Sequence, residues 1–160
     1  MATQRVVYLA VEGLLFPLVA NLKSPKSVGV STDSHMRRLG TMFEAFVNVG
    51  VVLNSCWVAK HGYRTVLDSL PRELRSKVVG ATIPGNKLLG PSAATLNLSR
   101  RCLLDQDYFR RQPNEAIVLD TDVRVVPIPL RHRAFIVEGG LWRARESAWA
   151  RLEEAFKTLT

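Results

Sequence analysis

Five polar side chains follow apolar runs of the sequence at the points where those runs end. Glu12 follows the first run, Asn54 and Ser55 follow the second, and Asp120 and Asp122 follow a later one. Carboxylates can act as general acids, general bases or ligands of hard cations, and amides and hydroxyls can donate hydrogen bonds to phosphate. Ligands of open parallel sheets bind beyond the carboxyl ends of the strands, so these residues are the first candidates for a site.

Ala10 stands at the end of the first apolar run, where an α/β enzyme often places its first catalytic carboxylate. A methyl group can neither attack phosphorus nor bind a cation. The histidines, His35, His61 and His132, show no pairing with a nucleophile. The sequence is therefore either that of an enzyme with unusual chemistry or that of an enzyme fold from which the chemistry has been lost.

The elements that must position these residues alternate along the chain. Apolar runs of strand length are followed by segments of helical periodicity, which is typical of an α/β fold with parallel strands and crossover helices. At 160 residues, the chain is expected to form one domain, residues 1–160. Strands are expected at residues 6–11, 49–53, 77–82, 115–119 and 134–137. Helices are expected from a cap at 31–33 to about residue 46, at 63–70 and at 97–111. A last helix is expected near the end of the sequence, with one apolar stripe made of Trp142, Trp149, Leu152, Phe156 and Leu159.

Residues 83–96 interrupt this pattern. The segment IPGNKLLGPSAATL contains Gly and Pro without a clear period and is expected to be a long surface loop near the strand ends. Long loops are often functional, so a flap over the site and an inert insertion are both open interpretations.

The chain is basic, with 22 Lys and Arg against 14 Asp and Glu, a net charge of +8. The excess is spread along the chain in short pairs, such as Arg100-Arg101, and there is no basic tail. Such a charge attracts phosphates, nucleic acid or an acidic partner. A solvated basic surface and a groove for a polyanion are both compatible with it, and binding that falls steeply with salt would favour the groove.

The two cysteines, Cys56 and Cys102, lack metal-ligand spacing and predict no disulfide framework, which fits a reducing cytoplasm. No run approaches the ~20 apolar residues that a membrane helix needs. Glu12 interrupts the apolar start of the chain, which therefore does not match a signal peptide. We expect a cytoplasmic protein that does not enter a membrane.

Four segments carry a resemblance to a known family. They are LAVEG at residues 9–13, VVLNSCW at 51–57, LPRELRSKVVGAT at 70–82 and VLDTD at 118–122. In order and spacing they resemble the haloacid dehalogenase superfamily, and more closely a small bacterial branch of it that is related to the domain of Swiss Army Knife RNA repair proteins. The resemblance implies a three-layer, Rossmann-like parallel sheet of about five strands with helices on both faces.

The resemblance also implies roles for the first motif. The family's first strand ends in Asp-x-Asp-Gly, in which the first aspartate is the nucleophile and a ligand of Mg²⁺ and the second is the general acid and base. This chain has Ala10 at the first position and Glu12 at the second. Glu12 keeps a carboxylate on a longer stem, which displaces the proton by about one ångström in a site that depends on geometry.

The remaining motifs imply binding residues. Phosphate would be bound by Asn54 or Ser55 after the second strand and by Arg100 or Arg101 from the helix before the fourth. Asp120 and Asp122 stand where the family holds its metal, although Thr121 between them makes the correspondence inexact.

Each of these residues has a simpler structural interpretation. Glu12 would be an exposed charge at a strand end, Asp120 a cap for the following turn, and Arg100 or Arg101 part of a solvated helix face.

Three hypotheses for function follow. The first is a catalytically degenerate protein, a pseudoenzyme, that binds a phosphorylated ligand or a protein partner. The second is a Mg²⁺-dependent phosphatase in which Glu12, Asp120 or Asp122 acts as a substitute carboxylate. The third is a nucleic-acid-binding module that uses the positive charge. Under the first hypothesis we expect no tightly bound cofactor, and at most Mg²⁺ at low affinity.

Overall fold

The computed structural model describes residues 4–18, 33–46, 48–82 and 93–158, and their centre is a five-stranded sheet in the order β3-β2-β1-β4-β5. Every pair of neighbouring strands is parallel. The α/β fold with a parallel sheet of about five strands is therefore confirmed. The strands are β1 (Arg5–Leu9), β2 (Val49–Leu53), β3 (Val78–Ala81), β4 (Glu115–Asp120) and β5 (Ala134–Ile136).

The register brings the carboxyl ends of the three central strands to one level. Leu9 of β1 pairs with Leu53 of β2 on one side and with Leu119 of β4 on the other. The ladder continues one residue further, because the Ala10 N–H donates to the Leu119 carbonyl at 3.0 Å and the Asn54 N–H donates to the Leu9 carbonyl at 2.8 Å. Residues that follow β1, β2 and β4 therefore meet at one edge of the sheet.

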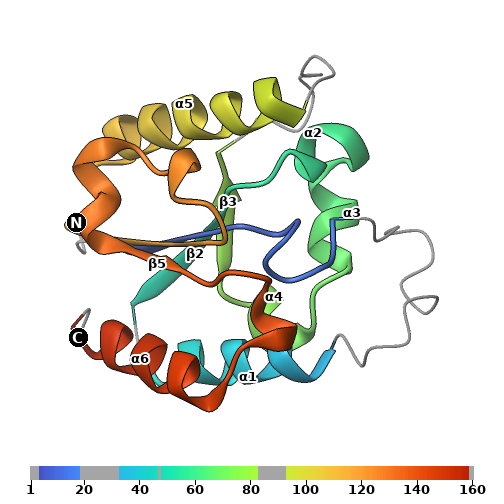
Figure 1. Ribbon diagram of the computed structural model, residues 1–160, viewed down its shortest axis with the longest axis vertical. Helices are drawn as coiled ribbons and strands as arrows, with labels where there is room; N and C mark the ends of the chain where they lie inside the picture. The colour runs from blue at the N-terminus through green and yellow to red at the C-terminus, as the bar shows by residue number, and fades with distance from the viewer. Residues whose placement is uncertain (1–3, 19–32, 47, 83–92, 159–160) are drawn as a thin grey trace.

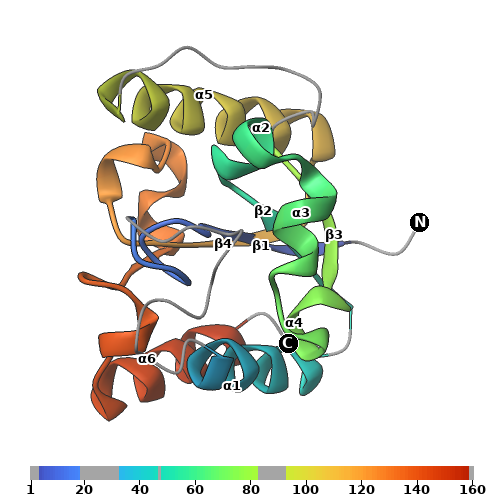
Figure 2. The same ribbon diagram turned by 90° about the vertical axis from the view of Figure 1, so that its right-hand side faces the viewer.

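Helices cover both faces of the sheet, as Figures 1 and 2 show. One layer contains α1 (Asp33–Glu44) and α6 (Glu146–Lys157), and the other contains α5 (Ala93–Arg111). The connection from β2 to β3 is made of three short helices, which lie beside β3: α2 (Trp57–His61), α3 (Tyr63–Asp68) and α4 (Arg72–Arg75). Short 3₁₀ helices complete the chain after β4: η2 (Val123–Val125), η3 (Ile128–Arg133) and η4 (Leu141–Arg143).

The protein has one hydrophobic core on each face of the sheet, because alternate residues of a strand point to opposite faces. These two cores hold the layers together. Val7 and Leu9 of β1 belong to the larger core, with residues of α1 and α6. Val6 and Tyr8 belong to the smaller core, with Leu104 of α5. The rigid sheet between two packed layers gives the strand ends fixed positions.

The structure corrects several expected boundaries. The first strand ends at Leu9, two residues earlier than expected, because the chain turns at the positive-φ residue Gly13. Helix α5 begins at Ala93, so the expected loop over 83–96 is wrong for its last residues, and residues 83–92 lie outside the described part. Trp142 belongs to η4 and not to the last helix. Helix α2 and the 3₁₀ helices were not expected.

Within the described ranges, no helix has the length and apolar character needed to cross a membrane.

Gly40 allows α1 to approach α4 closely. A Cβ atom at this position would lie 2.7 Å from the Leu74 nitrogen and 2.8 Å from the Glu73 carbonyl carbon, both of which are backbone atoms that cannot move aside alone. We expect Gly40→Ala to lower the free energy of unfolding by about 1–3 kcal/mol, as overpacking does elsewhere. Urea denaturation would measure it.

Gly80→Ala is the matched control for this prediction. A Cβ at Gly80 would meet the end of the flexible Arg111 side chain at 3.4 Å, an ordinary contact. Equal stability of the two variants would show that the α1–α4 contact is not tightly packed.

Candidate functional site

Glu12 lies inside the protein, in the turn that follows β1, and is only 7% exposed. Gly13 reverses the chain here with φ +83°, and its N–H donates to the Phe16 carbonyl at 2.7 Å. The Glu12 carboxylate accepts a hydrogen bond from the Ser55 hydroxyl at 2.5 Å and another from the Cys56 N–H at 2.9 Å. Glu12 thus joins the ends of β1 and β2, and its interpretation as an exposed charge is wrong.

Arg100 reaches from α5 to the end of β4. Its Nη2 donates to Asp120 Oδ2, and its Nε lies 3.9 Å from Glu12 Oε1. The other oxygen of Asp120 accepts the N–H groups of Thr121 at 2.7 Å and Asp122 at 3.3 Å. Asp120 therefore caps the following turn and also pairs with Arg100. Glu12, Ser55, Arg100 and Asp120 form a buried group that we call the strand-end network.

Burial and opposite charge act against each other in this network. Burial raises the pKa of Asp120 to about 6, because the loss of hydration outweighs the attraction of Arg100 and the two backbone N–H groups. Burial alone would lower the pKa of Arg100, but Asp120 and Glu12 raise it above its ordinary value. The Arg100 guanidinium thus forms ion pairs with both Glu12 and Asp120. When both carboxylates are ionised, the network carries a net charge of about −1.

Two buried nitrogen atoms at this edge lack hydrogen-bond acceptors among the described residues: Asn54 Nδ2 and Arg100 Nε. Asn54 is fully buried, and its Oδ1 accepts a hydrogen bond from the Thr82 hydroxyl at 3.1 Å. A buried donor without an acceptor costs about 1–3 kcal/mol, so such donors usually meet a water molecule or a ligand oxygen.

The other predicted site residues lie outside the network. Ala10 is fully buried at the position expected for a nucleophile. Asp122 gives only its backbone N–H to Asp120, because its carboxylate binds Arg124 at 2.8 and 3.0 Å. Arg101 is half-buried and makes no hydrogen bond or ion pair with the described residues of the network. Of the two arginines considered for the site, the structure therefore places Arg100 there.

The described side chains at this edge do not fit a Mg²⁺ site as they stand. Mg²⁺ needs oxygen ligands in near-octahedral geometry. Ala10 offers none, the oxygens of Asp120 already accept from Arg100 and two amides, and the carboxylate of Asp122 pairs with Arg124. No group of three His, Cys, Asp or Glu side chains in residues 4–18, 33–46, 48–82 and 93–158 could hold a metal ion.

Cys56 lies beside the network but is not an activated nucleophile. Burial, with the nearby charge of Glu12, raises the pKa of its thiol to about 12. The thiol is therefore protonated at neutral pH, and thiols react as thiolates.

Thr82 is a part of the site that the sequence analysis missed. It follows β3, its N–H donates to the Leu53 carbonyl at 3.0 Å, and its hydroxyl orients Asn54. The expected strand at 77–82 included Thr82, so the search for residues beyond the strand ends passed over it. In the structure β3 ends at Ala81, and Thr82 is the first residue after it.

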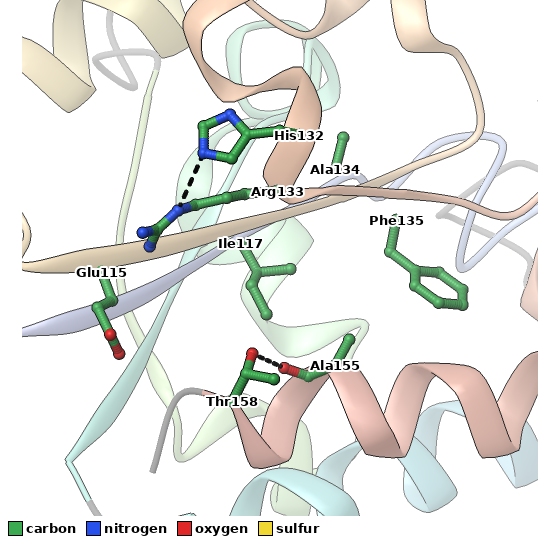
Figure 3. Close-up of a pocket in the computed structure, with 8 residues that line it drawn as sticks. All are labelled: Glu115, Ile117, His132, Arg133, Ala134, Phe135, Ala155 and Thr158. Carbon is green, nitrogen blue, oxygen red and sulfur yellow. Dashed lines mark hydrogen bonds between the residues drawn. The ribbon is translucent and has the colours of Figure 1, made fainter.

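Away from the strand-end network, a hollow of about 400 Å³ lies toward the amino ends of β4 and β5 (Figure 3). Its polar groups pair with one another or with neighbours: Arg133 Nε donates to His132 Nε2 at 3.3 Å, and the Thr158 hydroxyl donates to the Ala155 carbonyl at 2.6 Å. Glu115 forms an ion pair with Arg5 at 3.6 Å. Unlike the strand-end network, this hollow shows no buried donor that lacks an acceptor.

Comparisons with protein-family models, curated proteins and solved structures find no match to this chain.

Proposed function

We propose that this protein is a haloacid dehalogenase-like pseudoenzyme that binds a phosphorylated ligand at the carboxyl edge of its sheet without hydrolysing it. The observation that carries the proposal is the pair of buried donors without acceptors, Asn54 Nδ2 and Arg100 Nε. Asn54 Nδ2 has no acceptor among the described residues, and Arg100 Nε has only its 3.9 Å ion-pair contact with Glu12, which is too long for a hydrogen bond. Donors in this state call for an anionic or polar oxygen, whereas a cation would need acceptors without donors. The motifs at the strand ends support the same assignment.

The arrangement of the carboxylates argues against catalysis by the family route. Ala10 supplies no nucleophile, and Glu12 is held by Ser55, the Cys56 N–H and Arg100. Asp120, the other buried carboxylate at this edge of the sheet, is paired with Arg100. A substitute nucleophile would have to leave these partners and approach a phosphorus atom in line, which a network of buried ion pairs opposes.

Inorganic phosphate is the simplest probe of this function. We expect phosphate to raise the melting temperature relative to sodium chloride of equal ionic strength, with a stabilisation of about 2.7 kcal/mol at one hundred times its Kd. Asn54→Ala removes one unpaired donor and should weaken phosphate binding at least tenfold in titration calorimetry. Hydrolysis of p-nitrophenyl phosphate with Mg²⁺ should stay at background.

Two matched variants control this experiment. Thr82→Val removes the hydrogen bond to Asn54 Oδ1 but leaves Nδ2 in place, and Arg101→Met removes a positive charge from the same helix as Arg100. Arg101→Met should bind phosphate as the wild-type protein does. Thr82→Val leaves Asn54 without the hydroxyl that orients it, so it should bind phosphate more weakly than the wild-type protein but more tightly than Asn54→Ala. Wild-type protein that binds no phosphate would contradict the proposal, and turnover that disappears in Asp120→Ala would support the alternative of a phosphatase with a substitute carboxylate.

A further inference from the structure

A larger, open pocket, of about 580 Å³, lies at the turns that follow β1 and β4. Gly13 and Thr121 line it, and each belongs to a turn that also carries a carboxylate of the network: Gly13 follows Glu12, and Thr121 follows Asp120. The lining of the pocket and the network are thus joined along the chain at both turns. We call this hollow the Trp142 pocket, and its volume is in the range that small-molecule sites occupy, roughly 300–1,000 Å³.

Trp142 gives the pocket a fixed aromatic wall. Its ring lies so close to Gly140 that a Cβ there would be 2.3 Å from Cζ3, and Gly140 has φ +92°. On another side the ring meets His35 edge-on, with centroids 6.1 Å apart. His35 is itself buried and held by the Leu15 carbonyl at 2.8 Å. A half-buried ring held in this way can stack with a planar ligand at little cost in side-chain entropy.

The pocket also carries charges of both signs. Asp122 and Arg124 pair with each other, with contacts of 2.8 to 3.0 Å. Glu138 and Arg143 are exposed, and no hydrogen bond or ion pair links their side chains to other described residues. An acyl chain would desolvate these groups without compensation. A ring that carries both donors and acceptors could use Glu138 and Arg143 together with the stacking surface.

We infer that the Trp142 pocket binds the planar, nitrogen-containing ring of a phosphomonoester, as in a nucleoside monophosphate. The inference rests on the proposed function, because the phosphate of the same ligand would lie at the strand-end donors. The support for one ligand at both sites is that two turns are shared: Gly13 of the pocket follows Glu12, and Thr121 and Asp122 of the pocket follow Asp120, which pairs with Arg100.

Titration calorimetry with adenosine 5′-monophosphate, ribose 5-phosphate, glucose 6-phosphate and adenosine would test this inference. Wild-type protein should bind the nucleotide at least tenfold more tightly than either sugar phosphate. Trp142→Ala should abolish that preference and leave the affinity for ribose 5-phosphate within about twofold, since stacking on an aromatic ring supplies the difference. Trp142→Phe, which keeps a smaller ring, should retain part of the preference.

Phe109→Ala is the matched control, because Phe109 is an aromatic side chain that is 79% exposed on α5 and does not line the pocket. Circular dichroism would confirm that each variant is folded. Equal affinity of wild-type protein for the nucleotide and the sugar phosphates, or a preference that survives in Trp142→Ala, would overturn the ring site while leaving the proposed function intact. Adenosine binding that depends on Trp142, without binding of any phosphate, would support the ring site and overturn the proposed function.

Discussion

Replacing Arg100 with methionine is expected to lower the free energy of unfolding by about 3–5 kcal/mol. The substitution leaves Glu12 and Asp120 buried, close to each other and without their shared cation. Methionine fills a similar volume, so the loss would come from the charges rather than from a cavity. Urea denaturation at pH 7, followed by circular dichroism, would measure the change.

Two further variants separate the ion pairs from other effects. Arg101→Met removes the same charge from the neighbouring position of α5, outside the network, and should change stability by no more than about 0.5 kcal/mol. The triple variant Arg100→Met, Glu12→Gln, Asp120→Asn removes all three charges and should recover a large part of the loss. A triple variant as unstable as Arg100→Met would mean that packing, and not charge, holds this edge together.

The second large effect is expected from carboxylates placed at the family's first motif. Ala10→Asp with Glu12→Asp should make stability depend on Mg²⁺. Ala10 is fully buried, so a carboxylate there adds charge to an edge that already holds Glu12 and Asp120. Without a cation the double variant should lose several kcal/mol, and with Mg²⁺ part of the loss should return, because a bound ion stabilises the folded state according to its concentration and Kd.

Thermal melts with and without Mg²⁺, at constant ionic strength, would test this expectation. The wild-type protein is the reference, and its melting temperature should not respond to Mg²⁺ beyond the effect of salt. Calcium at the same concentration is the control. Simple charge screening would act equally with both ions, whereas a site shaped for Mg²⁺ should be stabilised less by Ca²⁺, which is larger and has longer ligand distances. If the folded double variant melts at the same temperature in both solutions, the strand ends do not form a latent cation site.

Much of the fold could be predicted because the strands of a doubly covered sheet are continuous apolar runs. All five residues of β2 are buried, and β4 is buried except at Glu115. Boundaries that depend on turns were less predictable. The sequence pattern extends β1 to the apolar Val11. In the structure the Val11 carbonyl accepts from the Leu15 and Phe16 N–H groups, as part of the turn at Gly13, and not from a neighbouring strand.

The strand-end argument selected Glu12, Ser55 and Asp120, which do lie in the network, but it also selected Asp122, which pairs with Arg124, and it missed Thr82. It could not decide positions on a helix face. The choice between Arg100 and Arg101 requires the rotation of α5. The buried stripe of this helix contains Arg100, Leu104 and Asp107, which follow helical spacing but are mostly charged. A search for apolar periodicity cannot find this stripe, because two of its three residues are charged. Their charges can be buried only because residues elsewhere in the fold pair with them. For example, the Tyr8 hydroxyl donates a hydrogen bond to Asp107 at 2.9 Å.

The two outermost strands of the sheet are also its shortest, with four residues in β3 and three in β5. A sheet edge is a template on which another chain can add a strand, and edge-to-edge pairing of this kind is a common route to aggregation. Such short edges offer few free backbone groups, and the basic residues Arg131 and Arg133 stand immediately before β5. Two copies of a chain with a net charge of +8 also repel each other. The short outer strands therefore disfavour pairing of two copies edge to edge, while the longer central strands carry most of the hydrogen-bonded ladder.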